Sequence, residues 1–508
     1  MLCVSLMPET TEQAFRDLAE AARAADLAEL RLDAMREFDL ARLLAHPPCP
    51  ILVTYRPRRE GGLYDGPEGP RLETLRQAAR LGARYVDVEY DAITAIGDVP
   101  PAKIIVSYHN HERTPDDLPD VYARLARTGA AVVKVAALAN HILDTVPILR
   151  LLRDATRPTI ALAMGPRGVL TRILAPKFGA LLTYAALGEG RAAAPGQVTA
   201  SEMRDLYHVS RIGPHTRVYG VIADPVGHSL SPRIHNAAFA ELGLDAVYLP
   251  LWVEGDPAAF VGAMRAFAFN GYSVTIPHKQ TVMKAVDEIE PLARRIGALN
   301  TIQRRPDGSL FGTNTDWTAG MASIEAVVGA RWLRGKRALL LGAGGVGRAM
   351  AFGLRQRGAD VTLTDVDASR AETLAREVGA AVMPISHLER GRAEKNERGR
   401  AEKNERGGSP DPPRATWDIL LNCTPVGMLP KTDASPAPAA LLRPGMVVYD
   451  AVYNPLETRL VKEARAAGCR TVAGIDHFVR QAVEQFELWT GRPAPVETMR
   501  RVVVEALR

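Results

Sequence analysis

Cysteine is scarce in this chain, with four residues in 508, at positions 3, 49, 423 and 469. They lie far apart and form no C-x-x-C pair, so the sequence argues against a disulfide framework and against a zinc site. Scattered free thiols are typical of a reducing compartment. We therefore expect a cytoplasmic location and no bound metal.

Long apolar runs are lacking as well. The most apolar stretch, residues 130–152, is interrupted by Lys134, His141, Asp144 and Pro147, which excludes a membrane-spanning helix there. The N-terminal apolar segment is short and runs into acidic residues, unlike a secretory signal. We expect no membrane partner.

Positive charge is never concentrated. The formal charge is +5, but the arginines are spread along the chain and no basic block is interleaved with aromatic residues, which make up 6%. This pattern excludes a nucleic-acid partner and favours an enzyme that handles small anions. With 47% apolar and 24% charged residues, 508 residues are expected to form two or three globular domains.

Residues 1–207 carry a repeated alternation of strand and helix. Apolar β-type runs alternate about eight times with Ala-, Leu- and Arg-rich segments at helical spacing, such as 72–81 and 118–127. This alternation predicts an α/β fold, a (β/α)8 TIM barrel. The expected strands are 2–6, 27–32, 50–55, 84–89, 103–108, 131–136, 158–163 and 180–184.

A polar stretch with Gly213 and Pro214 predicts a linker over 208–217. A second strand–helix alternation begins at Val218, and a further division falls near Gly335. Beyond it, GRAEKNER occurs twice in tandem, and residues 391–408 have no apolar face to bury. This charged repeat is expected to be a surface insertion.

A glycine-rich turn follows the apolar run 337–341 and precedes the amphipathic segment 348–357. In that context its glycines permit a tight turn and close approach to a pyrophosphate at a helix N-terminus. The sequence therefore predicts a nicotinamide dinucleotide site. The turn consists of Gly342, Ala343, Gly344, Gly345, Val346 and Gly347.

Asp365 ends the next expected strand, 360–364. A carboxylate there can accept a hydrogen bond from the ribose 2′-hydroxyl of NAD, but it repels the 2′-phosphate of NADP. No arginine follows at once, and Arg370 would compensate only by folding back. The cofactor is thus NADP or NAD, with Asp365 favouring NAD.

Polar clusters then follow one another in a fixed order. They are His228–Pro232, Ser273–Lys279, Gly297–Thr301, Asn314–Asp316, Asn422–Met428, Asp450–Pro455, and Gly474 with Gln481. Together, from Val218 to about Arg500, they resemble shikimate dehydrogenase. That resemblance implies a substrate-binding domain over 218–334, a Rossmann domain over 335–475, and C-terminal helices over 476–508 that return to the substrate domain.

The same resemblance implies roles for individual residues. Lys279 and Asp316 would be the acid/base pair at the hydroxyl being oxidised. The substrate shikimate would be bound by Ser229, Ser231, Thr275, Asn300, Tyr453 and Gln481. Thr424, Ala451 and Gly474 would join the glycine-rich turn at the cofactor.

This sequence departs from the shikimate dehydrogenase pattern in two places. Ser273 replaces a common asparagine. Asp365-Val366-Asp367 stands where NADP-selective members carry Asn-Arg-Thr, which resembles the NAD-using quinate/shikimate branch.

Lys134 stands inside the apolar run 131–136. A buried ammonium is costly unless it is paired or deprotonated, and a desolvated amine suits a Schiff base with a ketone. The plainer alternative is a lysine that reaches solvent from a strand end. His109 ends the preceding expected strand and can act as general base, whereas His111 lies in the following loop.

Further motifs accompany Lys134 and His109, namely Val4–Met7, Glu29–Asp33, Arg56 with Glu60–Gly62, Ser107–Asn110 with Thr114–Pro115, Arg172, and Pro195–Gln197. From Leu2 to about Tyr207 these residues resemble type I 3-dehydroquinate dehydratase. The resemblance implies that Lys134 forms the Schiff base, that His109 moves the proton, and that Glu60 orients His109. Arg172 would bind the substrate carboxylate. The remaining substrate contacts for dehydroquinate would be Ser5, Glu29, Arg31, Arg56 and Gln197. Ala193 departs from a serine common in bacterial members.

The two halves would then run consecutive steps, 3-dehydroquinate to 3-dehydroshikimate and 3-dehydroshikimate to shikimate, with small molecules as partners. Two alternatives stay open. One is a catabolic NAD-dependent quinate/shikimate dehydrogenase fusion, and the other has one half as a non-catalytic sensing or scaffold module. The oligomeric state, and whether the two sites face each other, are left open by the sequence.

Overall fold

The computed structural model describes residues 1–388 and 417–508, so the charged repeat at 391–408 lies outside the described residues. The chain packs as two units. The first consists of Met1–Pro232 and Gly243–Phe269, and the second of Arg233–Leu242 and Asn270–Arg508. The domain limits expected from the sequence stay predictions.

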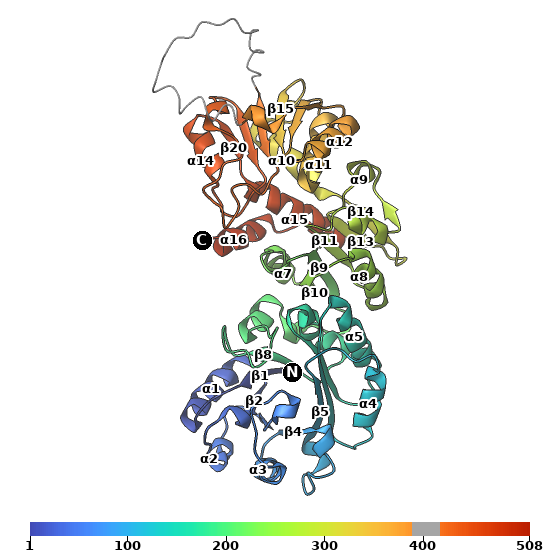
Figure 1. Cartoon of the computed structure of the whole chain (residues 1–508), viewed down its shortest axis with the longest axis vertical. Helices are drawn as coiled ribbons and strands as arrows, with labels where there is room; N and C mark the ends of the chain where they lie inside the picture. Colours follow the sequence, from blue (N-terminus) through green and yellow to red (C-terminus); the bar gives the residue numbers. More distant parts are fainter. Residues whose placement is uncertain (389–416) are drawn as a thin grey trace, which may run out of the picture. The chain divides into compact units, whose positions relative to one another are not determined.

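An eight-stranded parallel sheet forms the N-terminal part of the first unit (Figure 1). Its strand order is β7-β6-β5-β4-β3-β2-β1-β8. The strands are β1 (Leu2–Leu6), β2 (Leu27–Arg31), β3 (Ile51–Thr54), β4 (Tyr85–Glu89), β5 (Ile104–Asn110), β6 (Val132–Leu138), β7 (Thr159–Met164) and β8 (Thr183–Ala186).

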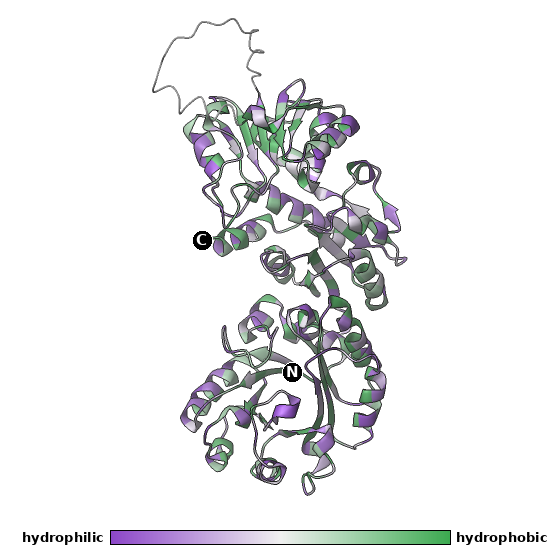
Figure 2. Ribbon diagram, in the orientation of Figure 1, coloured by the Kyte–Doolittle hydropathy of each residue, from purple (hydrophilic) through white to green (hydrophobic). Residues whose placement is uncertain are grey.

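This sheet curls into a nearly closed barrel. β7 and β8 end the strand order, and the Leu181 N–H donates to Thr159 O between them at 2.8 Å. Strands such as β1 and β7 are buried along their whole length, as parallel strands covered on both faces must be. Figure 2 shows these strands as mostly hydrophobic. The predicted α/β barrel is confirmed.

Every expected barrel strand occurs, and apart from β1 their limits differ from the expected ones by up to three residues. β8 begins at Thr183 rather than at Ala180, because the left-handed Gly179 ends a 3-10 turn and the Ala180 N–H bonds back to Ala175 O. β5 extends to Asn110, so His109 lies within the strand and not at its expected end.

The helices of the barrel lie outside the sheet (Figure 1). The first begins with a cap, since the Thr10 side chain accepts a hydrogen bond from the Gln13 N–H, and it buries Ala14, Leu18 and Ala21. These helices are α1 (Thr11–Ala24), α2 (Leu40–Ala45), α3 (Glu68–Arg80), α4 (Leu118–Ala126), α5 (Thr145–Asp154) and α6 (Val169–Ile173).

The expected linker 208–217 is ordered. Lys177 donates from Nζ to the carbonyl oxygens of Pro214 and Thr216, at 2.9 and 2.8 Å. The first unit continues with β9 (Arg217–Ala223), β10 (Ala246–Trp252) and α8 (Pro257–Met264), and β9 and β10 pair in parallel. A bidentate ion pair between Arg167 and Glu254 ties the loop after β7 to the residues that follow β10.

The second unit opens with short strands and helices. β13 pairs antiparallel with β11 and β14, and β12 pairs in parallel with β14. The elements are α7 (Ser231–Glu241, which begins in the first unit), β11 (Gly271–Val274), β12 (Glu288–Ile289), α9 (Pro291–Ile296), β13 (Thr301–Arg304), β14 (Leu310–Thr313) and α10 (Thr315–Val328).

A six-stranded parallel sheet follows, with order β17-β16-β15-β18-β19-β20. The order reverses between β15 and β18, the crevice where such sheets bind dinucleotides. α11 and α12 lie on one side of it and α14 on the other (Figure 1). The strands are β15 (Arg337–Leu341), β16 (Asp360–Thr364), β17 (Ala381–Val382), β18 (Ile419–Asn422), β19 (Val447–Asp450) and β20 (Arg470–Val472). The helices are α11 (Gly345–Gln356), α12 (Ala368–Val378), α14 (Arg459–Ala466), α15 (Gly474–Thr490) and α16 (Val496–Ala506).

Within the described part of the chain, every helix is too short or too polar to cross a membrane.

Candidate active sites

Lys134 lies in the middle of the barrel and is 5% exposed. Its Nζ donates to Asp87 Oδ2 at 2.8 Å, lies 3.5 Å from Glu29 Oε1, and stands 4.7 Å from the centre of the Tyr184 ring. The sequence left three possibilities open, pairing, deprotonation or a path to solvent, and the structure shows pairing. The lysine is buried as an ion pair.

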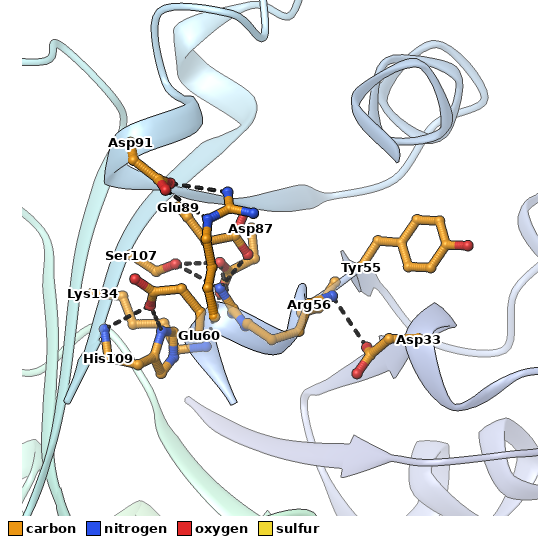
Figure 3. Close-up of polar contacts among 12 residues, drawn as sticks. Asp33, Tyr55, Arg56, Glu60, Asp87, Glu89, Asp91, Ser107, His109 and Lys134 are labelled. Carbon is orange, nitrogen blue, oxygen red and sulfur yellow. Dashed lines mark hydrogen bonds and ion pairs between the residues drawn. The ribbon is translucent and has the colours of Figure 1, made fainter. Parts of the chain in front are cut away.

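Asp87 is the acceptor at the centre of this cluster (Figure 3). Arg56 pairs with its Oδ1 at 2.8 Å, and the Ser107 hydroxyl donates to the same oxygen at 2.5 Å. Burial alone would raise the pKa of Asp87, but the Arg56 and Lys134 cations outweigh burial and hold that pKa well below its ordinary value. Asp87 therefore stays ionised and balances the charge of Lys134.

His109 and Glu60 form a second pair in the same site (Figure 3). Glu60 Oε2 accepts the His109 backbone N–H at 3.0 Å and lies 3.0 Å from Nδ1 of the ring. Burial lowers the pKa of His109 well below its ordinary value, and the charges of Arg56 and Lys134 lower it further. The ring is therefore neutral, and its contact with Glu60 places the proton on Nδ1 and leaves Nε2 as a base.

Arg172 is fully buried on α6 at 1% exposure. Its Nε has no hydrogen-bond partner among the described residues, and burial lowers its pKa to about 10. A buried guanidinium with an unsatisfied donor is suited to an incoming anion such as a carboxylate.

One pocket gathers every residue predicted for dehydroquinate. The Gln197 side chain closes part of its rim by accepting the Ala193 N–H at 2.8 Å, and both residues line the pocket. The predicted residues in the lining are Ser5, Glu29, Arg31, Arg56, Glu60, His109, Lys134, Arg172 and Gln197.

Sequence reasoning missed Asp87. It lies inside the buried strand β4, where a single carboxylate gives no motif of its own. The available signal was charge balance, because a buried lysine and arginine require buried carboxylates.

Lys279 and Asp316 meet in the second unit. Lys279 Nζ donates to Asp316 Oδ2 at 2.6 Å, and Asn300 Nδ2 donates to Oδ1 at 2.8 Å. Burial would raise the pKa of Asp316, but Lys279 and His477 outweigh it and hold that pKa well below its ordinary value. The carboxylate is therefore ionised and faces the lysine, as the predicted acid/base pair requires.

Local caps fix this geometry. Asn314 caps α10 by accepting the Asp316 N–H at 3.0 Å, which places Asp316 in the first turn of the helix. On the other side, the His278 N–H donates to Thr275 O, and Lys279 O accepts from the Leu299 N–H. These bonds hold the short loop that carries Lys279 against the residues preceding Asn300.

The glycine-rich turn has the predicted strand–turn–helix form. Gly342 has φ +95°, a conformation that favours glycine, and a Cβ on Gly347 would lie 1.9 Å from Gly342 O. A Cβ on Gly345 would lie 3.2 Å from Lys279 Cδ, so the lysine passes directly over the start of α11. The side-chain-free backbone of this turn and the N-terminus of α11 fit a dinucleotide pyrophosphate.

Asp365 is fixed at the end of β16. Its Oδ2 accepts the Ala343 N–H at 2.6 Å, and its Oδ1 accepts the Asp367 N–H at 2.8 Å. Arg370 lines the same pocket, but its Nε lies 3.4 Å from Asp367 Oδ2. The side chain that accepts the Ala343 N–H of the glycine-rich turn is therefore a carboxylate.

The dinucleotide pocket includes part of the predicted set. The predicted residues in its lining are Thr275, Lys279, Gly342, Ala343, Gly344, Gly345, Val346, Asp365 and Thr424. Gly347, Ala451 and Gly474 are outside this lining. Gly347 and Gly474 are packed against backbone instead, since a Cβ on Gly474 would lie 2.2 Å from Val452 O.

The other residues predicted for shikimate lie at element ends and on α15. The Ser231 N–H donates to Ser229 Oγ at 3.3 Å where α7 begins. The Tyr453 ring stacks on Phe478 at 4.1 Å, and Gln481 donates from Nε2 to Phe478 O at 3.0 Å. Gln481 O also accepts from Thr315 Oγ1 at 3.4 Å, next to Asp316.

Comparison with known proteins supports both halves. Residues 2–214 match the family described as type I 3-dehydroquinase, 221–302 the shikimate dehydrogenase substrate binding domain, and 474–504 the shikimate 5′-dehydrogenase C-terminal domain. An Arabidopsis thaliana protein named bifunctional 3-dehydroquinate dehydratase/shikimate dehydrogenase, chloroplastic, is 38% identical over 98% of this chain and 83% of its own length. The chain belongs to this bifunctional family.

Relatives of the dehydrogenase half alone are also similar. A Methanosarcina acetivorans shikimate dehydrogenase (NADP(+)) is 43% identical over 58% of this chain and 99% of its own length. A solved shikimate dehydrogenase in complex with NADP+ has 32% identity and a TM-score of 0.51, covering 58% of this chain and 98% of that one. The predicted activities of the bifunctional enzyme, a lyase and a nicotinamide-dependent oxidoreductase of the shikimate pathway, are confirmed.

Proposed function

We propose that the barrel converts 3-dehydroquinate into 3-dehydroshikimate through a Schiff base on Lys134. The proposal is carried by one observation, the buried Lys134 in the same pocket as a neutral His109 and the unsatisfied Arg172. Arg172 binds the substrate carboxylate and orients the ring, so that its ketone lies at Lys134 Nζ.

Proton transfers in the barrel follow from the charges. The Lys134 ammonium must lose a proton before its nitrogen attacks the ketone. The lowered pKa of Asp87 makes that carboxylate a weak base, so the neutral His109 is the acceptor. His109 passes this proton to the hydroxyl of the carbinolamine, which leaves as water as the imine forms, and the ring is neutral again. His109 then removes the proton next to the imine and gives it to the leaving ring hydroxyl, which departs as a second water. Hydrolysis of the product imine releases 3-dehydroshikimate and regenerates Lys134. Glu60 holds the ring by Nδ1 through these transfers.

We propose that Lys279 and Asp316 perform the second step, the reduction of 3-dehydroshikimate to shikimate. The Lys279 ammonium, held by Asp316 at 2.6 Å, donates a proton to the carbonyl oxygen that becomes the hydroxyl. A bound nicotinamide supplies the hydride. The glycine-rich turn and Thr424 would hold that cofactor, while Ser229, Ser231, Thr275, Asn300, Tyr453 and Gln481 would bind the substrate.

We further propose that NAD is preferred over NADP. The Asp365 carboxylate next to the Ala343 N–H can accept a hydrogen bond from a ribose 2′-hydroxyl and repels a 2′-phosphate. The cofactor preference would then differ from that of the relatives named as NADP-dependent. A catabolic NAD-dependent quinate/shikimate dehydrogenase therefore stays open as the alternative. A cytoplasmic location also remains part of the proposal.

Borohydride trapping tests the dehydratase chemistry. Full-length protein reduced in the presence of dehydroquinate should carry one substrate adduct on Lys134, detected by peptide mass spectrometry. The Lys134→Ala variant should carry none, whereas Lys279→Ala should be labelled like the parent. An unlabelled Lys134 in active protein would overturn the Schiff-base proposal.

A matrix of quinate and shikimate, each with NAD and with NADP, tests the second half. Shikimate with NAD should give the highest kcat/KM. Rates confined to shikimate with NADP would contradict the role given to Asp365, and quinate rates equal to those with shikimate would favour the catabolic alternative.

A further inference from the structure

His477 lies beside the acid/base pair without belonging to it. It occupies the first turn of α15 and is 6% exposed. Its Nε2 lies 3.7 Å from Asp316 Oδ1, the oxygen that does not contact Lys279. That distance is too long for a direct hydrogen bond, but it places the Nε2 edge of the ring next to the buried carboxylate.

The far side of the imidazole is unsatisfied. His477 Nδ1 has no hydrogen-bond partner within residues 1–388 and 417–508, and neither has the hydroxyl of Tyr449, whose ring meets the imidazole edge-on at 5.9 Å. Burying such a nitrogen costs about 1–3 kcal/mol. An aliphatic side chain would fill this space without that cost, so the imidazole calls for an explanation beyond packing.

Charged and titratable groups face the imidazole from four elements of the fold. α10 presents Asp316, and the loop after β11 presents Lys279. Glu484 follows two turns along α15, hydrogen-bonded to Thr318, and burial raises its pKa to about 7, with Asp316 adding to the rise. On the sheet side, Cys423 and Tyr449 have pKa values raised by burial and stay neutral.

Asp316 therefore has a contact for each oxygen. Lys279 holds Oδ2, while Asn300 and His477 approach Oδ1. Burial alone would raise the pKa of Asp316, and both Lys279 and His477 oppose it. Loss of His477 would leave Asp316 with one fewer favourable interaction for its charged form, and the carboxylate would take up a proton at higher pH.

We propose that His477 is a positioning residue of the dehydrogenase, which holds the Asp316 carboxylate from the side opposite Lys279 and sets the pH range in which this pair exchanges a proton with the substrate. The inference deepens the function proposed for Lys279 and Asp316 and rests on it. His477 does not touch the reacting atoms; it acts through Asp316.

The test compares pH profiles of shikimate oxidation for the parent, His477→Leu and His477→Gln in the full-length protein. His477→Leu should move the acid limb of the kcat profile to higher pH. A rise of about one unit in the apparent pKa of that limb lowers kcat about tenfold at pH values below it. KM for shikimate should change less than twofold, on the order of experimental scatter. His477→Gln keeps an N–H donor and should recover most of kcat.

The dehydratase activity of the same chain is the internal control for protein concentration, and the melting temperature is the control for folding of the dehydrogenase unit. An unchanged acid limb in His477→Leu, or in His477→Ala if the leucine variant does not fold, would overturn the positioning role. A lower melting temperature with an unchanged profile would do the same. Survival of shikimate oxidation in Lys279→Ala would instead overturn the proposed function, so the two failures are distinguishable.

Discussion

At the residue scale, Glu60 contributes to the dehydratase site at a cost in folding stability. Burial raises its pKa to about 7, against the opposing charge of Arg56 and with help from Glu89. Because the folded pKa lies above the ordinary value of 4.5, the folded state binds the proton more tightly, and stability falls as pH rises from about 4.5 to about 7.

Glu60→Gln removes that charge. The variant should be more stable than the parent at pH 8, by about 3 kcal/mol at most, with the difference vanishing near pH 4.5. Its dehydratase rate should fall about 100-fold, because the imidazolium of His109 loses its partner. Thermal denaturation at both pH values, with the dehydratase assay, checks this; a variant less stable at pH 8 would contradict it.

Asp365 gives the second prediction at this scale. Asp365→Asn keeps an acceptor for the Ala343 N–H but removes the negative charge next to the ribose. The ratio of kcat/KM for NADP to that for NAD should rise at least about tenfold, a change of about 1.4 kcal/mol. Asp360→Asn, at the exposed start of the same strand, is the control and should leave the ratio unchanged. An unchanged ratio in Asp365→Asn would exclude the carboxylate as the discriminator.

At the scale of elements, the connection from β15 to α11 depends on one close backbone approach. A Cβ on Gly347 would lie 1.9 Å from Gly342 O, whereas a Cβ on Gly344 would meet nothing within 4 Å. Gly347→Ala must therefore push the helix away from the turn, and Gly344→Ala need not.

We expect Gly347→Ala to raise KM for the nicotinamide cofactor at least about tenfold, since a displacement near 1 Å can cost more than that in a positioned site. Gly344→Ala, whose Cβ would meet no protein atom within 4 Å although the residue lines the same pocket, should change KM less. Steady-state kinetics with varied cofactor measure both, and the dehydratase rate should be constant throughout. Equal effects of the two substitutions would show that packing at Gly347 is not what forms the site.

At the scale of the whole molecule, one chain carries two activities. Lys134 and Lys279 each pair with a carboxylate of their own unit, Asp87 and Asp316. Lys134→Ala should abolish dehydration and leave shikimate oxidation, and Lys279→Ala should do the reverse. An equimolar mixture of the variants should convert dehydroquinate to shikimate with NADH or NADPH present, followed by liquid chromatography. Loss of both activities in either variant would show that the units are not catalytically separate.

Local patterns in the sequence determined much of this protein. Strands of a parallel sheet that is covered on both faces carry largely apolar runs, so the barrel strands could be predicted to within three residues at each end. The glycine-rich turn could be predicted because its residues are contiguous. The resemblance to two enzyme families, position by position, predicted the roles of Lys134, His109, Lys279 and Asp316.

Only the tertiary structure decided which charges meet. Asp87 has no motif, yet it accepts from Lys134 because β4 and β6 both point side chains into the barrel. His477 lies opposite Lys279 across Asp316 because α15 packs on α10. Such pairings join residues far apart in the chain, and their energies depend on distance and burial, which a linear pattern does not contain.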